Sequence, residues 1–437
     1  MKKITLLVLL LWLPNLVFTW SEDAHFFYWR NQFILLSGML GLVYMALAML
    51  LAIRLPKVEN YVHGQDKAYA IHKWLGIRAG ITLVIHWLLV EIPHWLIRFN
   101  LLERPQRRAQ FAQSLDLINW THLAKTIGEL SFYCLTAVIA ISLIQSISYR
   151  KFRFTHKLAG ALFLAGAFHS IILLDNQPSA LGMNLLVWGA ALLGSICAFI
   201  SLSGQIGKRR KVQGQVSYLK HINEPQSQYR VLHIGITLDT PMAYTAGQFA
   251  YLDFLDGEPA HPFSVLKYDV FSQQVEFAIK DLGDYTHQLY HSLTFGQPVS
   301  VEGGYGRFCL PQATHQVWIG AGIGIVPFIA WIQALSQKAS NSNHQIDLYY
   351  CRETRQQTAF VELIQTMIAP LHNIQLHIYT AGNHEYLSAK EITQGRDLSE
   401  LSISFCGPMA FSQSMKNALI DAGLAPNNFY SERFMMR

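Results

Sequence analysis

Two stretches of the sequence decide the fold: HKWLGIRAGITLVIH at residues 72–86 and HKLAGALFLAGAFH at residues 156–169. Each begins and ends on a histidine and is otherwise mostly apolar. The histidines are 14 residues apart in the first stretch and 13 apart in the second. At about 1.5 Å per residue, both spacings place the histidines about 20 Å apart along a helix, within a hydrocarbon core about 30 Å thick. The sequence therefore predicts two membrane helices with histidines at two matching heights.

Ionisable residues inside a membrane span are costly and point to function. A single membrane histidine is as often a packed polar residue, but four in two matched pairs predict ligands. Both helices are expected to run outward, so His72 pairs with His156 and His86 with His169. Each pair is the bis-histidine ligation of an electron-transfer haem with no open coordination site. We therefore expect two stacked b-type haems.

Helix geometry leaves two points open. Fourteen residues return to nearly the same helix face, whereas thirteen leave an angular offset, so a bend near Gly160 or Gly166 or a rotation between the haems is needed. Arg78, between the two ligands of its helix, either neutralises a haem propionate or pairs with a backbone carbonyl. The remaining histidines of this half are expected to be interfacial or solvated: His25, His63, His94 and His122.

The composition also places half of the chain in lipid. Of its 437 residues, 51% are hydrophobic and 14% are charged, whereas soluble proteins carry about 25% charged residues. The charge deficit lies before about residue 205. The expected spans are residues 4–20, 32–53, 69–92, 122–147, 155–174 and 181–203. The first is either a signal peptide or a retained helix, and the lack of a small-x-small cleavage site after it favours a retained helix.

Lysine and arginine predict the orientation. With the N-terminus in the cytoplasm, the basic segments 54–67, 150–157 and 208–211 are all cytoplasmic, as the positive-inside rule requires. The outer loop 93–121 runs against the rule, with Arg98, Arg104, Arg107 and Arg108. We expect an integral protein of a bacterial inner membrane whose soluble half is cytoplasmic.

Charge and cysteine usage exclude other classes. The net charge of +6, without a basic stripe, does not indicate a nucleic-acid partner. The five cysteines are scattered without a CxxC pair, which argues against a disulfide framework, a zinc site or an iron–sulfur site.

The soluble half has two parts. From residue 212, six short alternating segments predict a small antiparallel barrel. After residue 316, strands alternate with helices, which predicts a parallel α/β sheet. The expected domains are a transmembrane di-haem domain at 1–205, an FAD-binding barrel at 212–312 and an NAD(P)H-binding α/β domain at 313–437.

A glycine turn joins the first strand and helix of the α/β part. Gly320, Gly322 and Gly324, followed by Pro327, let backbone amides and a helix N-terminus approach a pyrophosphate. The spacing differs from the GxGxxG fingerprint and is a weak signal alone.

An ordered set of motifs carries a much stronger signal. They are HPFSV at 261–265, LGDYT at 282–286, GGYG at 303–306, GAGIGIVP at 320–327 and FCGP at 405–408. In this set the chain resembles the ferredoxin–NADP reductase superfamily. With its histidine pairs it resembles the NADPH oxidase and ferric reductase family from about residue 30 onward.

The resemblance implies an FAD site in the barrel. Phe263 would lie against the flavin ring, with Ser264 near its N5 atom, where the family commonly has threonine. His261 would lie by the ribityl–phosphate region, and Gly283 and Thr286 would donate to the pyrophosphate. Pro262 and Val265 complete the first motif.

It also implies a nicotinamide site that takes NADPH, with NADH possible. The GAGIGIVP turn would hold the NADPH pyrophosphate, and Cys406, Gly407 and Pro408 would lie near the nicotinamide. Arg352 would pair with the 2′-phosphate, or is simply a solvated strand-end arginine. Phe434 would stack over the flavin and move for nicotinamide, or is tail packing without that role.

The resemblance implies electron transfer from cytosolic NADPH, through FAD and two haems, to oxygen or a ferric chelate outside. Ser264, Cys406 and Phe434 would be the catalytic residues. One alternative is a haem-binding subunit that passes electrons to a partner protein, and another is a membrane-anchored flavin reductase without haem. The expected partners are the lipid bilayer and the small-molecule acceptor, with no obligatory protein partner.

Overall fold

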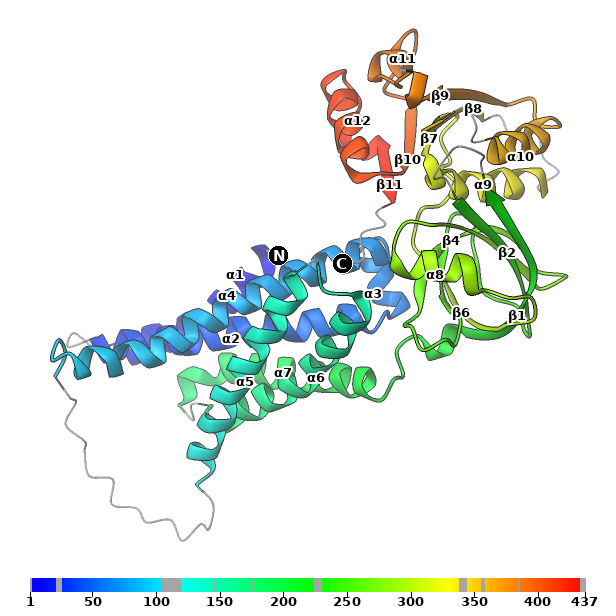
Figure 1. Ribbon diagram of the computed structural model, residues 1–437. Coiled ribbons are helices and arrows are strands. Elements are labelled where there is room, and N and C mark those ends of the chain that lie inside the picture. The colour runs from blue at the N-terminus through cyan, green and yellow to red at the C-terminus, as the bar shows by residue number, and fades with distance from the viewer. Residues whose placement is uncertain are drawn as a thin grey trace. The chain divides into compact units, whose positions relative to one another are not determined.

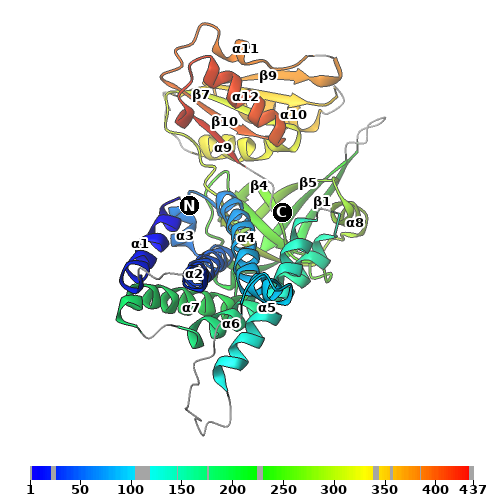
Figure 2. The ribbon, with the colours of Figure 1, turned by 90° about the vertical axis from the view of Figure 1, so that its left-hand side faces the viewer.

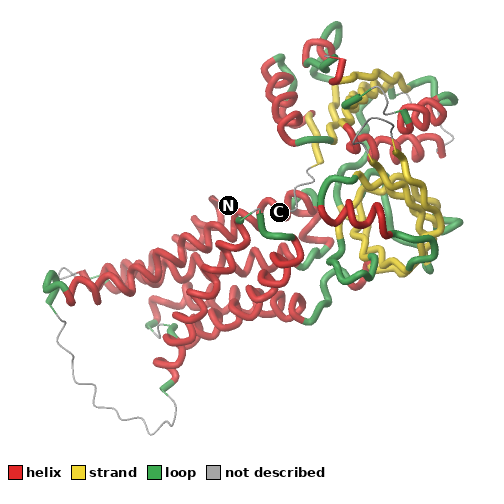
Figure 3. Tube along the Cα trace, in the orientation of Figure 1, coloured by secondary structure: helices red, strands yellow, loops and turns green. Residues whose placement is uncertain are grey.

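The computed structural model describes residues 2–20, 26–103, 119–144, 146–174, 177–223, 230–337, 344–354, 358–383 and 385–432. The chain divides into two compact units, residues 1–61 with 68–206 and residues 62–67 with 207–436. Helices form the first unit, and all the strands lie in the second (Figure 3).

The first unit is a helical bundle (Figures 1 and 2). Its helices are α1 (Lys2–Thr19), α2 (Phe26–Ala52), α3 (Pro56–Tyr61), α4 (Gln65–Arg98), α5 (Trp120–Leu143), α6 (Tyr149–Ile172), η1 (Pro178–Ala180) and α7 (Leu181–Leu202). α7 packs against α1, α2 and α6, and α5 pairs with α6. Gly194 of α7 makes one close approach possible, because the Phe163 ring lies where a Cβ at position 194 would be.

Six long helices form where the sequence predicts spans, but only five of those described are long and apolar enough to cross a membrane. The sixth, α6, begins at Tyr149, and its first turns carry Arg150, Lys151, Arg153 and Lys157. The remaining stretch, 155–172, also carries His156, Lys157 and His169 among its apolar residues. By length and composition the described residues thus offer five candidate spans, and α6 is a sixth long helix of more polar composition.

α4 continues for 34 residues although Pro93 lies within it. Proline has no N–H, so it cannot donate to the carbonyl of residue 89. The guanidinium of Arg30 donates instead, from Nε to the Leu89 oxygen (2.8 Å) and from Nη2 to the Val90 oxygen (3.2 Å). A side chain of α2 thus replaces the hydrogen bonding that the proline removes.

The first part of the second unit is a closed six-stranded barrel in the order β1-β2-β5-β4-β3-β6. Its strands are β1 (Lys211–Asn223), β2 (Arg230–Leu238), β3 (Phe249–Asp253), β4 (His261–Asp269), β5 (Gln274–Lys280) and β6 (Pro298–Tyr305). All pairings are antiparallel. Helix α8 (Asp284–Ser292) lies on the outside of the barrel (Figures 1 and 2). The predicted antiparallel barrel is confirmed.

The second part is a five-stranded parallel sheet in the order β11-β10-β7-β8-β9. Its strands are β7 (His315–Ala321), β8 (Gln345–Arg352), β9 (Ile374–Thr380), β10 (Leu401–Cys406) and β11 (Phe429–Glu432). Its helices are η3 (Gly322–Ile325), α9 (Val326–Gln337), α10 (Ala359–Ile368), η4 (Ala381–Asn383), α11 (Ala389–Thr393), α12 (Met409–Asp421) and η5 (Pro426–Asn428). The predicted parallel sheet is confirmed, but the sequence analysis missed the short edge strand β11.

Alternation along β7 explains why both faces of the sheet are covered, because neighbouring side chains of a strand point to opposite faces. Trp318 packs with residues of α9 and α10 in one buried cluster. Val317 and Ile319 pack with residues of α11 and α12 in another. The strand order reverses between β7 and β10, and ligands of open α/β sheets bind at the carboxyl ends of strands at such a point.

Candidate functional site

The four membrane histidines meet in two facing pairs. The ring centroids of His72 and His156 are 5.8 Å apart, and those of His86 and His169 are 6.4 Å apart. Histidine nitrogens lie about 2 Å from a bound metal, so two imidazoles on opposite sides of one ion have ring centres about 6 Å apart. Both separations suit a metal ion held between the two rings.

Three of these imidazoles hydrogen-bond to the backbone through Nδ1. The acceptors are the carbonyl oxygen of Ala48 for His72 (2.9 Å), that of Ile34 for His86 (3.0 Å) and that of Ala124 for His169 (2.8 Å). A carbonyl can only accept, so Nδ1 carries the proton in each neutral ring. The lone pair is then on Nε2, which is the arrangement of a metal-binding histidine oriented by an outer hydrogen bond.

Each histidine-bearing helix has one neighbouring helix that supplies the hydrogen-bond acceptors for both of its histidines. α2 supplies the acceptors for both histidines of α4, and α5 supplies those for both histidines of α6. For His156 the partner of Nδ1 is a side chain, the Ser142 hydroxyl, at 3.1 Å. All four Nδ1 atoms are therefore occupied, which leaves Nε2 as the remaining ring nitrogen of each histidine.

The space beside the rings fits a haem. Gly76, one turn after His72, and Gly166, one turn before His169, each have no other atom within 4 Å of where a Cβ would lie. A cavity of about 650 Å³ is lined by His86, His169 and mostly apolar side chains. Two imidazoles facing each other beside open apolar space match the axial ligands of a bis-histidine haem.

A bare metal ion fits less well. Among the described residues, no three or more His, Cys, Asp or Glu side chains come together in a way that would hold a metal ion. Each histidine pair offers two protein ligands, which is the number that a bis-histidine haem takes from the protein.

The sequence also drew attention to basic residues of this unit outside the two histidine pairs. Within the described part of the chain, the half-buried side chain of Arg78 has no hydrogen-bond or ion-pair partner, so it is not paired with a backbone carbonyl. Arg98 ends α4. Arg104, Arg107, Arg108 and His25 lie outside the described residues.

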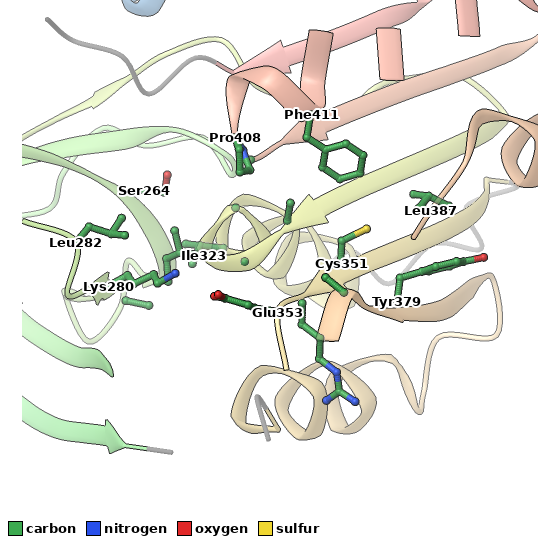
Figure 4. A pocket seen from close by; sticks show the side chains of 18 of the residues that line it. Ser264, Lys280, Leu282, Ile323, Cys351, Glu353, Tyr379, Leu387, Pro408 and Phe411 are labelled. Atoms are coloured by element: carbon green, nitrogen blue, oxygen red, sulfur yellow. The ribbon is translucent and has the colours of Figure 1, made fainter. Parts of the chain in front are cut away.

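A second cavity, also of about 650 Å³, lies in the second unit, which is called the reductase unit below (Figure 4). β4 lines it from the barrel, and the ends of β7, β8 and β10 line it from the sheet. The predicted residues that line it are Pro262, Phe263, Ser264, Thr286, Gly322, Gly324, Arg352, Gly407 and Pro408. Strands far apart in sequence thus bring together most of the motifs.

The other predicted residues that the structure describes are not part of the cavity lining. Val265 and Cys406 are fully buried. Gly320 lies within β7, and Pro327 is buried in the first turn of α9, where its missing N–H costs nothing. Phe434 lies outside the described residues.

His261 and Gly283 are engaged near the barrel. The His261 ring stacks on that of Tyr285, with centroids 4.3 Å apart. The N–H of Gly283 donates to Thr286 Oγ1 (3.0 Å), and that hydroxyl donates to the Gly283 carbonyl (3.1 Å). Both predicted pyrophosphate donors are therefore used within the first turn of α8.

The glycine turn is shaped for close backbone approach. Gly322 has φ +58°, a left-handed conformation that favours glycine. A Cβ at Gly324 would fall on the carbonyl of Cys406 at the end of β10. Because α9 begins directly after this turn, a helix N-terminus and a glycine-rich backbone adjoin the cavity, which suits a phosphate group.

The end of β8 brings two opposite charges to the cavity. Arg352 Nε donates to Thr380 Oγ1 (3.1 Å), which positions the guanidinium at the cavity wall. Glu353, the next residue, also lines the cavity and was missed from the sequence, since only its neighbour matched an expected role. Burial raises the pKa of the Cys351 thiol to about 12, so this cysteine is not a thiolate nucleophile at neutral pH.

Aromatic side chains on the sheet side were also missed. Tyr379 and Phe411 line the cavity (Figure 4), as does Tyr386, and all three offer flat surfaces for a ring to stack against. They come from three separate segments without a shared motif, so no sequence signal grouped them.

A buried carboxyl lies beside Cys406. Glu432 of β11 is opposite Cys406 of β10 in the parallel pairing and is 6% exposed. Burial raises the pKa of Glu432 well above its usual range and likewise raises the pKa of Cys406, so both side chains are held in their neutral forms. The sequence analysis missed Glu432, although it stands two residues before Phe434.

Comparisons with known proteins agree with the two units. Residues 37–167 match the family described as ferric reductase like transmembrane component. The chain is 22% identical over 52% of its length to the anthranilate 1,2-dioxygenase electron transfer component of Acinetobacter baylyi, and covers 68% of that protein. It is 22% identical over 47% of its length to the CDP-6-deoxy-L-threo-D-glycero-4-hexulose-3-dehydrase reductase of Yersinia pestis, and covers 64% of that protein.

Among solved structures, ferredoxin-NADP+ reductase from Plasmodium falciparum covers 51% of this chain, with 96% of its own length, a TM-score of 0.43 and 18% identity. The Amycolatopsis cytochrome P450 reductase covers 52% of this chain, with 70% of its own length, a TM-score of 0.44 and 18% identity.

The helical bundle carries the match to a ferric reductase like transmembrane component, and the barrel with the parallel sheet forms a second module. Taken together, the chain is similar to membrane oxidoreductases that join such a transmembrane component to a reductase-type electron-transfer module. The predicted resemblance is confirmed at this level.

Proposed function

We propose that this protein is a membrane flavocytochrome that transfers electrons from cytosolic NADPH, by way of FAD and two b-type haems, to an acceptor on the opposite side of the membrane. The observation that carries the proposal is the set of four histidines in two facing pairs, each with Nδ1 occupied and Nε2 left for a metal. This arrangement has no purpose in a reductase that is merely anchored by its helices.

The reductase cavity supports the first half of the path. Phe263 and Ser264 on β4 would hold the flavin ring, while the turn from Gly322 to Gly324 would accept the pyrophosphate of the nucleotide. Arg352 would bind the 2′-phosphate and favour NADPH, with NADH as a slower donor. Bound nicotinamide supplies a hydride, flavin divides its two electrons and each haem accepts one at a time.

The membrane unit supports the second half. His72 and His156 would hold one haem, and His86 and His169 the other. Since both irons would have two protein ligands, the final acceptor would be reduced without binding to iron. Oxygen and a ferric chelate both satisfy this condition, and neither requires a protein partner.

We place the reductase unit in the cytoplasm of a bacterial cell, at the inner membrane. The support is the basic residues at 54–67, 150–157 and 208–211, which lie on one side of the membrane when the N-terminus is cytoplasmic.

Arg78, half-buried and without a protein partner in the described residues, is available to neutralise a haem propionate.

An anaerobic absorbance spectrum of the detergent-purified protein, taken before and after NADPH with FAD present, tests the proposal. We expect about two haems per chain, with bands of reduced b-type haem appearing on addition of NADPH. Bleaching of flavin without a haem signal would instead identify an anchored flavin reductase. Haem that NADPH leaves oxidised would identify a haem subunit served by another protein.

A further inference from the structure

One of the four histidines, His156, differs from the other three in the kind of group that hydrogen-bonds to its Nδ1 atom. The Nδ1 atoms of His72, His86 and His169 each have a backbone carbonyl within 3.0 Å. For His156 the one hydrogen-bond partner among the described residues is the Ser142 hydroxyl on α5 at 3.1 Å. A backbone acceptor persists through any substitution at its own position, whereas this acceptor exists only because residue 142 is serine.

The hydrogen-bond network assigns the direction of this bond. The Ser142 hydroxyl has one proton, and it donates that proton to the Val138 carbonyl one turn earlier (2.7 Å). The oxygen of Ser142 is then an acceptor toward His156, so Nδ1 carries the ring proton and Nε2 has the lone pair. The result is a chain from imidazole to hydroxyl to backbone carbonyl, in which each bond polarises the next.

We propose that Ser142 is a positioning residue that fixes the tautomer of His156 and tunes the reduction potential of the haem that His72 and His156 would hold. The inference rests on the proposed haem ligation. An acceptor on the outer nitrogen makes an imidazole a more basic ligand, which stabilises the oxidised metal and lowers its potential. Loss of the Ser142 hydroxyl should therefore raise the potential of that haem.

A second serine makes a matched contact in the other pair. Ser37 Oγ lies 3.2 Å from His86 Nδ1 and donates its own proton to the Phe33 carbonyl (2.6 Å). His86, however, also has the Ile34 carbonyl at 3.0 Å. Removal of the Ser37 hydroxyl leaves that acceptor in place, so Ser37 should matter less than Ser142. The two haem sites are thus unequal in their dependence on side chains.

The test is a spectroelectrochemical titration of the full-length, haem-loaded protein in detergent, with low-temperature electron paramagnetic resonance of the oxidised haems. In Ser142→Ala, we expect one of the two midpoint potentials to rise enough to shift the electron distribution between the haems about tenfold, which is ~59 mV for one electron. One of the two resonance signals should change with it. Ser142→Thr restores the hydroxyl and should restore both readouts.

Two further variants serve as controls. Thr126 of α5 donates to the His122 carbonyl one turn earlier (3.1 Å), as Ser142 does to Val138, but it is exposed and outside the cavity lining. Thr126→Ala should leave both potentials unchanged, and Ser37→Ala should shift one of them by less than Ser142→Ala does.

The outcomes separate the two hypotheses. Unchanged potentials in Ser142→Ala, or a fall in place of a rise, would overturn the role of Ser142 while the haem proposal stands. Loss of one haem in Ser142→Ala, with full retention in Ser142→Thr and Thr126→Ala, would support a positioning role in its stronger form. A wild-type protein that holds no haem would overturn the proposed function itself.

Discussion

The membrane site and the reductase site are assembled in opposite ways. In the membrane unit, the four paired histidines come from two helices, and a constant rise per residue converts a spacing of 13 or 14 residues into a difference in height. In the reductase unit, the cavity gathers the ends of β4, β7, β8 and β10. The first site can be predicted by counting along the chain, whereas the second depends on strand order.

The two sites also differ in what holds them. Backbone carbonyls and a serine fix the histidines, so their geometry depends on few side chains. The reductase cavity depends on close packing of backbone segments, as at Gly324 against Cys406. Substitutions should therefore separate the two functions, with loss of haem in one unit and loss of nucleotide use in the other.

The largest effect is expected from loss of a ligand. His86→Leu should remove the haem held with His169 and reduce NADPH-driven reduction of the external acceptor by ~10²-fold or more, because removal of even an outer partner of a metal ligand costs about 10–100-fold. Haem content by absorbance and acceptor reduction in vesicles measure this. NADPH-dependent reduction of ferricyanide by the reductase unit should persist.

His122→Leu is the matched control for that prediction. His122 is an exposed histidine in the first turn of α5 and belongs to neither pair. Haem content in this variant should equal that of the wild type. A full complement of haem in His86→Leu would contradict the assignment of the ligand.

An intermediate effect is expected from a substitution in the reductase cavity. In Gly324→Ala the new Cβ would collide with the Cys406 carbonyl, and displacement of the turn by about 1 Å can cost ~10²-fold in rate. We expect such a fall in kcat/KM for NADPH with ferricyanide as acceptor, with haem content unchanged.

Gly322→Ala is a second substitution in the same turn, with which the effect of Gly324→Ala can be compared. Position 322 has open space for a Cβ, but its φ of +58° imposes a left-handed conformation that costs a non-glycine residue about 1–2 kcal/mol. Its effect should be smaller than that of Gly324→Ala. Equal activity of Gly324→Ala and the wild type would show that the turn is not part of the nucleotide site.

The smallest effect should be confined to the choice of nucleotide. Arg352→Ala removes one charged hydrogen-bonding group, worth about 1.5–3 kcal/mol, so kcat/KM for NADPH should fall about 10–100-fold. The value for NADH should change little, because NADH has no 2′-phosphate. Lys416→Ala, which removes a cation outside the cavity lining, is the control. An equal loss with both nucleotides would contradict the role of Arg352 in reading the 2′-phosphate.

Prediction from the sequence succeeded where local periodicity is strong. The six long helices, the six barrel strands and the alternation of strands and helices after residue 316 follow from apolar patterns. The sixth predicted span, α6, is the most polar of these helices and is not among the five candidate spans of the described residues. Strand β11 failed because four residues give no periodic signal.

Within the sites, the sequence identified residues that stand in motifs and missed those that do not. Glu353, Tyr379 and Phe411 reach the cavity from separate segments. Glu432 is brought beside Cys406 by the pairing of β11 with β10. The register between two parallel strands decides which side chains become neighbours, and the sequence of one strand does not specify that register.

The sequence alone determined the heights of the four histidines and the order of the reductase motifs, because both depend on distances along the chain. The orientation of the helices also predicted the two pairs, which the structure brings together. Tertiary structure decided which nitrogen of each ring is left free. It did so by placing the carbonyls of Ala48, Ile34 and Ala124 and the hydroxyl of Ser142 against the rings. Those contacts join helices through space, where neither spacing nor composition specifies a partner.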